Sequence, residues 1–119
     1  MSKILIVDDS EDLRELFVLI IEREGYEAVT ASCKRDLLAM LPVIFPDLLL
    51  LDVRLGGEDG RQLCKEIKTQ YSNIPVILVS GSPELLLDYE ECKADGVIEK
   101  PFYMTTAIEK INTLIKQTA

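Results

Sequence analysis

Short runs of apolar residues recur along the chain and predict a sheet that is buried on both faces. The run over 4–7 is four aliphatic residues in a row, and two aspartates end it. Such a run is typical of a strand covered on both sides, because a strand with one wet face alternates apolar with polar residues. Similar runs predict buried strands over 47–51, 75–79 and 96–98, and a more exposed strand over 26–31.

Helical patterns fill most of the intervals between these strands. Ser10 is a suitable N-cap residue, apolar side chains recur at helical spacing after it, and Gly25 is placed to end the helix. Further helices are expected over 32–45, whose proline should kink or shorten it, and over about 59–70 and 103–116. The last of these is expected to bury Met104, Ile108, Ile111, Leu114 and Ile115.

The segment after the 75–79 strand is also predicted to be helical. Ser82, Pro83 and Glu84 supply an N-cap, a proline at the first helical position and an acid in the first turn. This pattern predicts a helix through about Cys92. Three leucines in a row follow Glu84, and they cannot all face the sheet, so they either pack locally or leave an exposed apolar patch.

Five strands that alternate with five helices predict βαβ units. The expected fold class is therefore α/β, with a parallel sheet and helices on both of its faces. A chain of 119 residues has the length of one domain, so we expect a single domain over 1–119. In sheets of this kind, ligands bind outside the carboxyl ends of the strands.

Composition excludes several classes of function. Thirteen basic against 21 acidic residues give 13 − 21 = −8, which disfavours binding of nucleic acid by this chain alone. The absence of histidine removes Ser-His-Asp triads and histidine-ligated zinc. Three widely spaced cysteines fit neither a disulfide framework nor a zinc site. Without a membrane-length apolar run or a signal-peptide pattern, the expected location is the cytoplasm and no membrane contact is expected.

Polar side chains gather where the predicted strands end. Asp8 and Asp9 follow the first strand, Asp52 the third, Ser80 the fourth and Lys100 the fifth. Carboxylates about 5 Å apart repel one another by about 3 kcal/mol at an effective dielectric constant near 20. Either one of them holds a proton or a cation lies among them, and Mg²⁺ together with a phosphate fits an all-oxygen set.

The order and spacing of these motifs identify a resemblance that covers essentially the whole chain. The segments that carry it are Lys3–Asp9, Leu13-Arg14, Leu48–Gly60, Val79-Ser80-Gly81 and Lys100-Pro101-Phe102. Together they resemble the receiver domain of bacterial two-component response regulators, in particular chemotaxis-type regulators. The resemblance implies a flavodoxin-like, doubly wound (βα)5 fold with strand order 2-1-3-4-5.

The resemblance also implies a role for each strand-end residue. Asp52 would accept a phosphoryl group from a phosphohistidine on a sensor histidine kinase or phosphotransfer protein, with Ser80 and Lys100 assisting. Mg²⁺ would be held by Asp8, Asp9, Asp52 and the backbone carbonyl of Arg54, with Asp8 acting largely through water. The protein would be its own substrate, a signalling switch more than a conventional enzyme. Its fourth helix, fifth strand and fifth helix would contact a downstream protein, an output domain or a second copy.

Four positions depart from the family pattern. Val97 stands where an aromatic residue is common, and it either completes the last strand or alters signalling. Gly56 replaces a common proline, and Lys93 stands where a glycine usually begins a turn. Arg54 is larger and more basic than the usual residue, so it is either a solvated loop charge or, with Ser82, a control on water access to the phosphoryl group.

Other functions remain open. One alternative is a pseudo-receiver, a protein-interaction module that is not phosphorylated, although the complete set of site residues argues against it. A haloacid-dehalogenase-type phosphatase would need a second acid at position 54, and a flavodoxin would need a hydroxyl-rich loop where Asp8 and Asp9 stand. The sequence is compatible with a single-domain regulator and with the amino-terminal part of a longer one.

Overall fold

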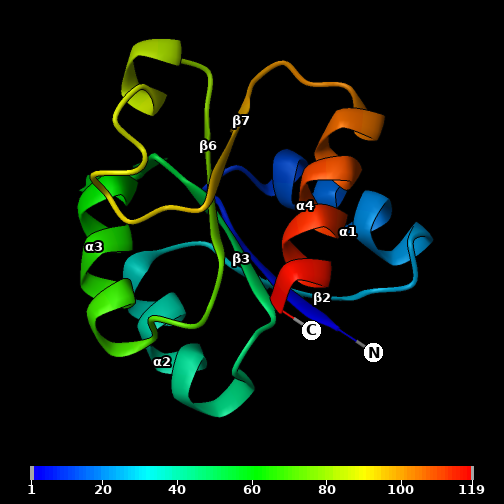
Figure 1. Cartoon of the computed structure of the whole chain (residues 1–119), viewed down its shortest axis with the longest axis horizontal. Helices are drawn as coiled ribbons and strands as arrows, with labels where there is room; N and C mark the ends of the chain where they lie inside the picture. Colours follow the sequence, from blue (N-terminus) through cyan, green and yellow to red (C-terminus); the bar gives the residue numbers. More distant parts are fainter. Residues whose placement is uncertain (1, 119) are drawn as a thin grey trace.

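Five parallel strands form one sheet at the centre of the molecule (Figure 1). The computed structural model describes residues 2–118. The strands are β1 (Lys3–Val7), β2 (Glu27–Ala31), β3 (Leu48–Asp52), β6 (Val76–Ser80) and β7 (Gly96–Glu99). They lie in the order β2-β1-β3-β6-β7. If only these five are counted along the chain, this order is 2-1-3-4-5, which confirms the prediction.

Two helices cover each face of the sheet (Figure 1). The helices α1 (Glu11–Arg23) and α4 (Met104–Thr118) pack on one face, and α2 (Lys34–Ile44) and α3 (Gly60–Gln70) pack on the other. Successive residues of each central strand point to opposite faces, so both sets must be apolar. In β1, for example, Leu5 joins the core under α2 and α3, while Ile6 joins the core under α1 and α4.

The ends of the first two helices follow from local sequence. The Ser10 hydroxyl accepts a hydrogen bond from the Leu13 N–H (3.4 Å) and caps α1, as predicted. Gly25 follows the end of α1 with a φ of +88°, a conformation that glycine adopts without steric cost. Pro42 lies in the last turn of α2, which ends two residues later, in agreement with the expected shortening.

The helix predicted from Ser82 through Cys92 is wrong. The segment contains only one short 3-10 helix, η1 (Pro83–Leu86), and consecutive turns follow it. The side chain of Ser82 makes no capping bond. Only Leu86 of the three consecutive leucines is buried, so the segment has no continuous apolar stripe to hold a longer helix on the sheet. The described chain therefore has four α-helices instead of the five helices expected.

Two further details differ from the expectations. Residues 54–59 form a short antiparallel hairpin, β4 (Arg54–Leu55) and β5 (Glu58–Asp59), which the sequence did not predict. In α4, Met104 is 44% exposed, and Ala107 and Ile111 are the fully buried residues. Met104 lies in the first turn, before the helix reaches the sheet core.

Within residues 2–118, no helix combines the length and the apolar character needed to span a membrane.

Candidate functional site

The strand register brings the predicted site residues to one edge of the sheet. Val7 pairs with Leu51, so Asp8 and Asp52 are the next residues of neighbouring strands. Ser80, the last residue of β6, pairs with Glu99 in β7, and Lys100 follows. In Figure 1 these carboxyl ends of the strands point toward the top of the view.

Asp8 is fixed by its own loop. It is 3% exposed, and its Oδ1 accepts a hydrogen bond from the Ser10 N–H (2.9 Å). The Arg14 guanidinium, from α1, donates to the Asp8 carbonyl oxygen (2.7 Å). The arrangement leaves Asp8 Oδ2 directed at Lys100, whose Nζ lies 3.4 Å away.

Asp52 lies at the centre of the site. It is 6% exposed, and its Oδ1 is 3.4 Å from the Lys100 ammonium. Burial, together with the negative charges of Asp8 and Asp9, raises the pKa of Asp52 to about 6, although Lys100 opposes the shift. At pH 7.5 the carboxylate is still mostly ionised, and it is less well solvated than an ordinary aspartate.

Asp9 completes a group of three carboxylates. Oxygen atoms of Asp8, Asp9 and Asp52 all lie within 4.8 Å of one another. Asp9 is exposed, and its Oδ2 accepts a hydrogen bond from the Gly56 N–H at the tip of the β4–β5 hairpin (3.1 Å). Lys100 is the one cation in hydrogen-bond contact with these carboxylates among the described residues, so the group retains excess negative charge. A set of carboxylate oxygens with this charge suits a hard divalent cation such as Mg²⁺.

The hydroxyl side of the site is built from the end of β6. Ser80 is buried, and its Oγ accepts a hydrogen bond from the Ser82 N–H (3.0 Å). The Arg54 guanidinium donates to the Ser82 hydroxyl (3.3 Å), which joins the hairpin after Asp52 to the loop after Ser80. The contact brings together the two side chains for which the sequence left open a control on water access to the phosphoryl group.

Gly60 is a site-supporting residue that the sequence did not reveal. A Cβ atom at this position would lie 2.2 Å from the Asp52 carbonyl oxygen and 2.8 Å from the Val53 Cα. The Gly60 N–H also donates to the Val53 carbonyl (2.6 Å). The first residue of α3 therefore packs directly on the backbone of Asp52, a contact that depends on how the hairpin returns and that no local pattern encodes.

The positions that depart from the family pattern have distinct surroundings. Val97 is a partly buried residue of β7 that packs against the core under α2 and α3. Gly56 and Lys93 both have positive φ, +61° and +67°. Lys93 lies far from the carboxylates in sequence and lines a separate groove with residues of α3.

A comparison with known protein families identifies the family of the chain. Residues 4–112 match the family model described as the response regulator receiver domain. The chain belongs to this family. It is thus a receiver domain of the kind that acts in two-component signalling, as the sequence motifs predicted.

Curated relatives support the assignment over nearly the whole receiver domain. The transcriptional regulatory protein YxdJ of Bacillus subtilis is 37% identical over 123 residues, which cover 98% of this chain and 52% of YxdJ. The alkaline phosphatase synthesis transcriptional regulatory protein PhoP of the same organism is 30% identical, over 98% of this chain and 50% of PhoP. The chain spans about half the length of these relatives.

Solved structures show the same fold. The receiver domain of NtrX from Brucella abortus superposes with a TM-score of 0.90 at 35% identity and covers 95% of this chain and 98% of that one. A CheY-like receiver domain protein from Methanospirillum hungatei gives a TM-score of 0.92 at 29% identity, over 99% and 96% of the two chains.

Proposed function

We propose that Asp52 accepts a phosphoryl group from a phosphohistidine on a partner kinase or phosphotransfer protein. The observation that carries this proposal is the environment of Asp52. Its buried carboxylate lies 3.4 Å from the Lys100 ammonium and within 4.8 Å of two further carboxylates. An ionised but poorly solvated carboxylate with a cation beside it is suited to act as a nucleophile.

The transfer exchanges one bond to phosphorus for another. A carboxylate oxygen of Asp52 attacks phosphorus, the phosphorus–nitrogen bond of the donor histidine breaks, and its electron pair stays on the histidine nitrogen. The product on this chain is an acyl phosphate. Lys100 offsets the charge of the phosphoryl oxygens, and the Ser80 hydroxyl donates to one of them once it leaves its contact with Ser82.

Mg²⁺ is the cofactor that the donor set fits. Asp8, Asp9, Asp52 and the backbone carbonyl of Arg54 would hold it, with Asp8 acting largely through water. When bound, the ion would neutralise phosphoryl oxygens during transfer. Asp9 would then exchange its present contact with the Gly56 N–H for the metal.

Membership of the family supports the choice of partners that we propose. A histidine kinase or phosphotransfer protein supplies the phosphoryl group in the cytoplasm. A downstream protein, an output domain or a second copy binds over η1, β7 and α4, which correspond to the predicted fourth helix, fifth strand and fifth helix. Leu87 and Tyr103, 78% and 81% exposed, support this choice of surface because they offer apolar area to a partner.

Intact-protein mass spectrometry tests the proposal. In Mg²⁺ and a small acyl phosphate donor, the wild type should gain the mass of one phosphoryl group, and Asp52→Asn should gain none. Asp9→Asn should bind Mg²⁺ much more weakly, because it loses a direct carboxylate ligand. A wild-type protein that binds Mg²⁺ but never gains mass would support the pseudo-receiver alternative.

A further inference from the structure

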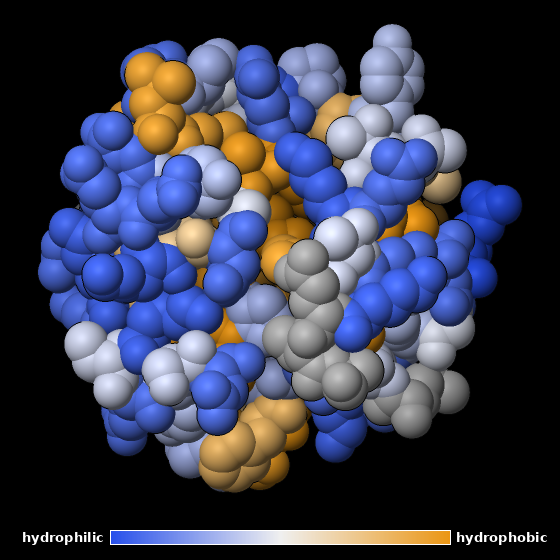
Figure 2. Space-filling model, in the orientation of Figure 1, coloured by the Kyte–Doolittle hydropathy of each residue, from blue (hydrophilic) through white to orange (hydrophobic). Residues whose placement is uncertain are grey.

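A groove lies between α3 and the turn over residues 90–94, away from the carboxylate site. Its volume is about 460 Å³, within the range of small-molecule sites. Its lining combines lysines, hydroxyl side chains and one acid: Lys65, Lys68, Thr69, Ser72, Glu90, Lys93 and Ala94. Figure 2 shows that hydrophilic side chains cover the surface over α3.

The balance of charge in this groove is unusual for the chain. The whole protein carries a net charge of −8, yet three lysines line the groove; Asp95 pairs with Lys68, and Lys65 and Lys93 stand against Glu90, which leaves 2 − 1 = +1. On a protein with a net negative charge, anions are attracted only to a surface region in which positive charge is in local excess.

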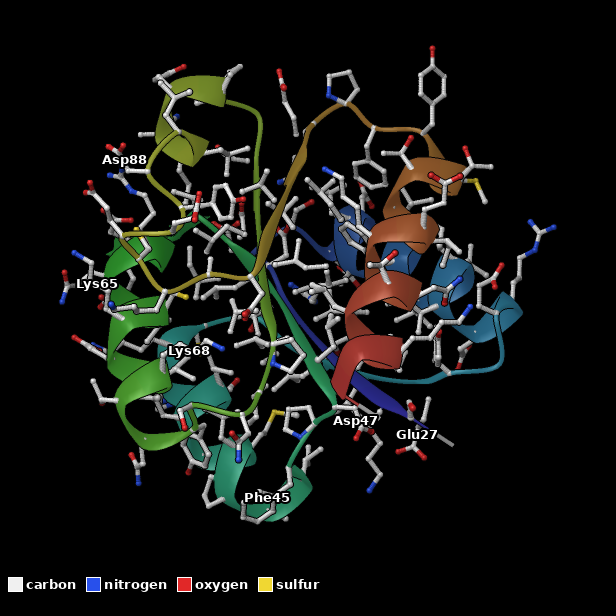
Figure 3. The ribbon with its side chains drawn as sticks, viewed as in Figure 1. Glu27, Phe45, Asp47, Lys65, Lys68 and Asp88 are labelled. Atoms are coloured by element: carbon white, nitrogen blue, oxygen red, sulfur yellow. The ribbon has the colours of Figure 1, made fainter. Side chains whose placement is uncertain are left out.

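Lys68 is a structural part of the groove. Its side chain is 11% exposed, and its Nζ lies 2.8 Å from both Asp95 Oδ2 and the Ile74 carbonyl oxygen. These contacts neutralise the charge of Lys68 within the protein, so it is not available to a ligand. Lys65, one turn earlier on α3 (Figure 3), and Lys93 are exposed and have no ion pair within residues 2–118. Two ammonium groups on opposite walls are therefore available to a ligand.

Lys93 is in a backbone conformation that lysine rarely adopts. Its φ is +67°, in the left-handed region where glycine or asparagine is favoured. A side chain kept at such a position against the local steric preference is a reason to look for function. Here the side chain is the second cation of the groove.

We propose that this groove binds a small anion with at least two negative charges, a phosphate or a carboxylate compound, between Lys65 and Lys93. The Ser72 hydroxyl, which makes no hydrogen bond among the described residues, adds a neutral donor. A bound anion would hold the 90–94 turn, which leads into β7, against α3. The proposal is independent of phosphorylation at Asp52.

Amide chemical-shift titration tests the groove directly. Pyrophosphate and citrate are added separately to the full chain in metal-free buffer at low ionic strength, so that the carboxylate site repels both. We expect saturable shifts in residues 65–72 and 90–94 with at least one of them. Saturation by pyrophosphate alone assigns a phosphate ligand, and saturation by citrate alone assigns a polycarboxylate. Linear shifts, or shifts spread over all lysines, with both compounds would overturn the proposal.

Four variants separate binding from folding. Lys93→Gly removes the charge but suits the backbone conformation, so the variant should unfold at the same or a higher urea concentration than the wild type. Lys93→Gly and Lys65→Gln should each weaken binding about three- to fivefold, the effect of one exposed charge. Glu90→Gln should strengthen it. Lys116→Gln, on the opposite face of the sheet, should leave it unchanged. Equal affinity of the wild type and Lys93→Gly would contradict the proposal.

Discussion

The chain leaves the sheet after β3 and after β6, and the two exits are held in different ways. After β3, the hairpin over 54–59 returns to place Gly60 on the backbone of Asp52, and Asp59 caps α3. After β6, residues 81–95 make one 3-10 turn, bury only Leu86, Cys92 and Ala94, and rejoin the sheet where the Asp95 carboxylate accepts from the Val76 N–H. Close backbone packing on Asp52 fixes the first exit, whereas three buried side chains and Asp95 hold the second against the sheet.

This difference matches the two roles that the exits have in the proposed chemistry. The phosphoacceptor needs a fixed position relative to the metal and to Lys100, since phosphoryl transfer depends on alignment. The loop that carries Ser80 and Ser82 must be able to move toward a new phosphoryl group. Few buried contacts make a segment easier to rearrange.

The largest expected effect is at the β3 exit. Gly60→Ala places a Cβ 2.2 Å from the Asp52 carbonyl oxygen, so the backbone must shift, and we expect a loss of about 3 kcal/mol or more in unfolding free energy. Gly57→Ala is the matched control, because a Cβ there has no neighbour within 4 Å. Urea denaturation measures both. Similar stabilities for the two variants would show that the exit is not tightly packed.

The stability of the β6 exit should depend on Leu86 and not on its neighbour Leu87. Leu86 is 6% exposed and Leu87 is 78% exposed, although they are adjacent. Leu86→Ala should cost about 2 kcal/mol, while Leu87→Ala should change the unfolding free energy by less than about 0.5 kcal/mol. If thermal or urea unfolding shows equal losses, residues 83–87 pack differently from the structure described.

The charge at the centre of the site should lower stability at neutral pH. Because the pKa of Asp52 is raised to about 6 on folding, the folded state binds the proton more tightly. The contribution of Asp52 to the unfolding free energy should therefore fall as the pH rises from about 4 to about 6. Without Mg²⁺ at pH 7.5, Asp52→Asn should be more stable by about 1–2 kcal/mol, a value reduced for solvent screening, and the difference should vanish near pH 4.

An exposed amide supplies the control for this pH dependence. Asn73→Ser removes no titratable group, so its difference from the wild type should be nearly constant over the same pH range. A stability difference for Asp52→Asn that does not change with pH would mean that burial does not disfavour the Asp52 charge.

Arg54 links the two exits, and its loss should have the smallest effect. Its contact with the Ser82 hydroxyl places the guanidinium where it can cover the approach of water or hold phosphoryl oxygens. Arg54→Ala should speed loss of the phosphoryl group about three- to thirtyfold, or about 0.7 to 2 kcal/mol of barrier. Single-turnover dephosphorylation at equal Mg²⁺ measures it, with Arg35→Ala as a remote control. Equal or slower decay would show that Arg54 is only a solvated charge.

The sequence predicted the central strands and the residues at their ends, because a single factor determines each of these positions. Leu5 and Ile6, like the other residues of the central strands, are buried on opposite faces, so a continuous apolar run is sufficient to identify the strand. Asp8 and Asp52 come together because parallel strands end at the same edge.

The parts that the sequence did not predict depend on contacts between distant residues. Gly60 is required by the carbonyl of Asp52, eight positions earlier, and nothing in the local pattern indicates that approach. The turns after Leu86 replace the predicted helix because burial of Cys92 and attachment of Asp95 to the Val76 N–H outweigh a favourable helix start.

The most direct test of the proposed function locates the phosphoryl group. The protein is treated with an acyl phosphate donor and Mg²⁺, the acyl phosphate is trapped by borohydride reduction, and peptides are mapped by mass spectrometry. The account predicts a single modified residue, Asp52, with no signal in the absence of Mg²⁺ and a strong reduction in Lys100→Met. Modification of Asp8 or Asp9 instead, or of no residue, would contradict it.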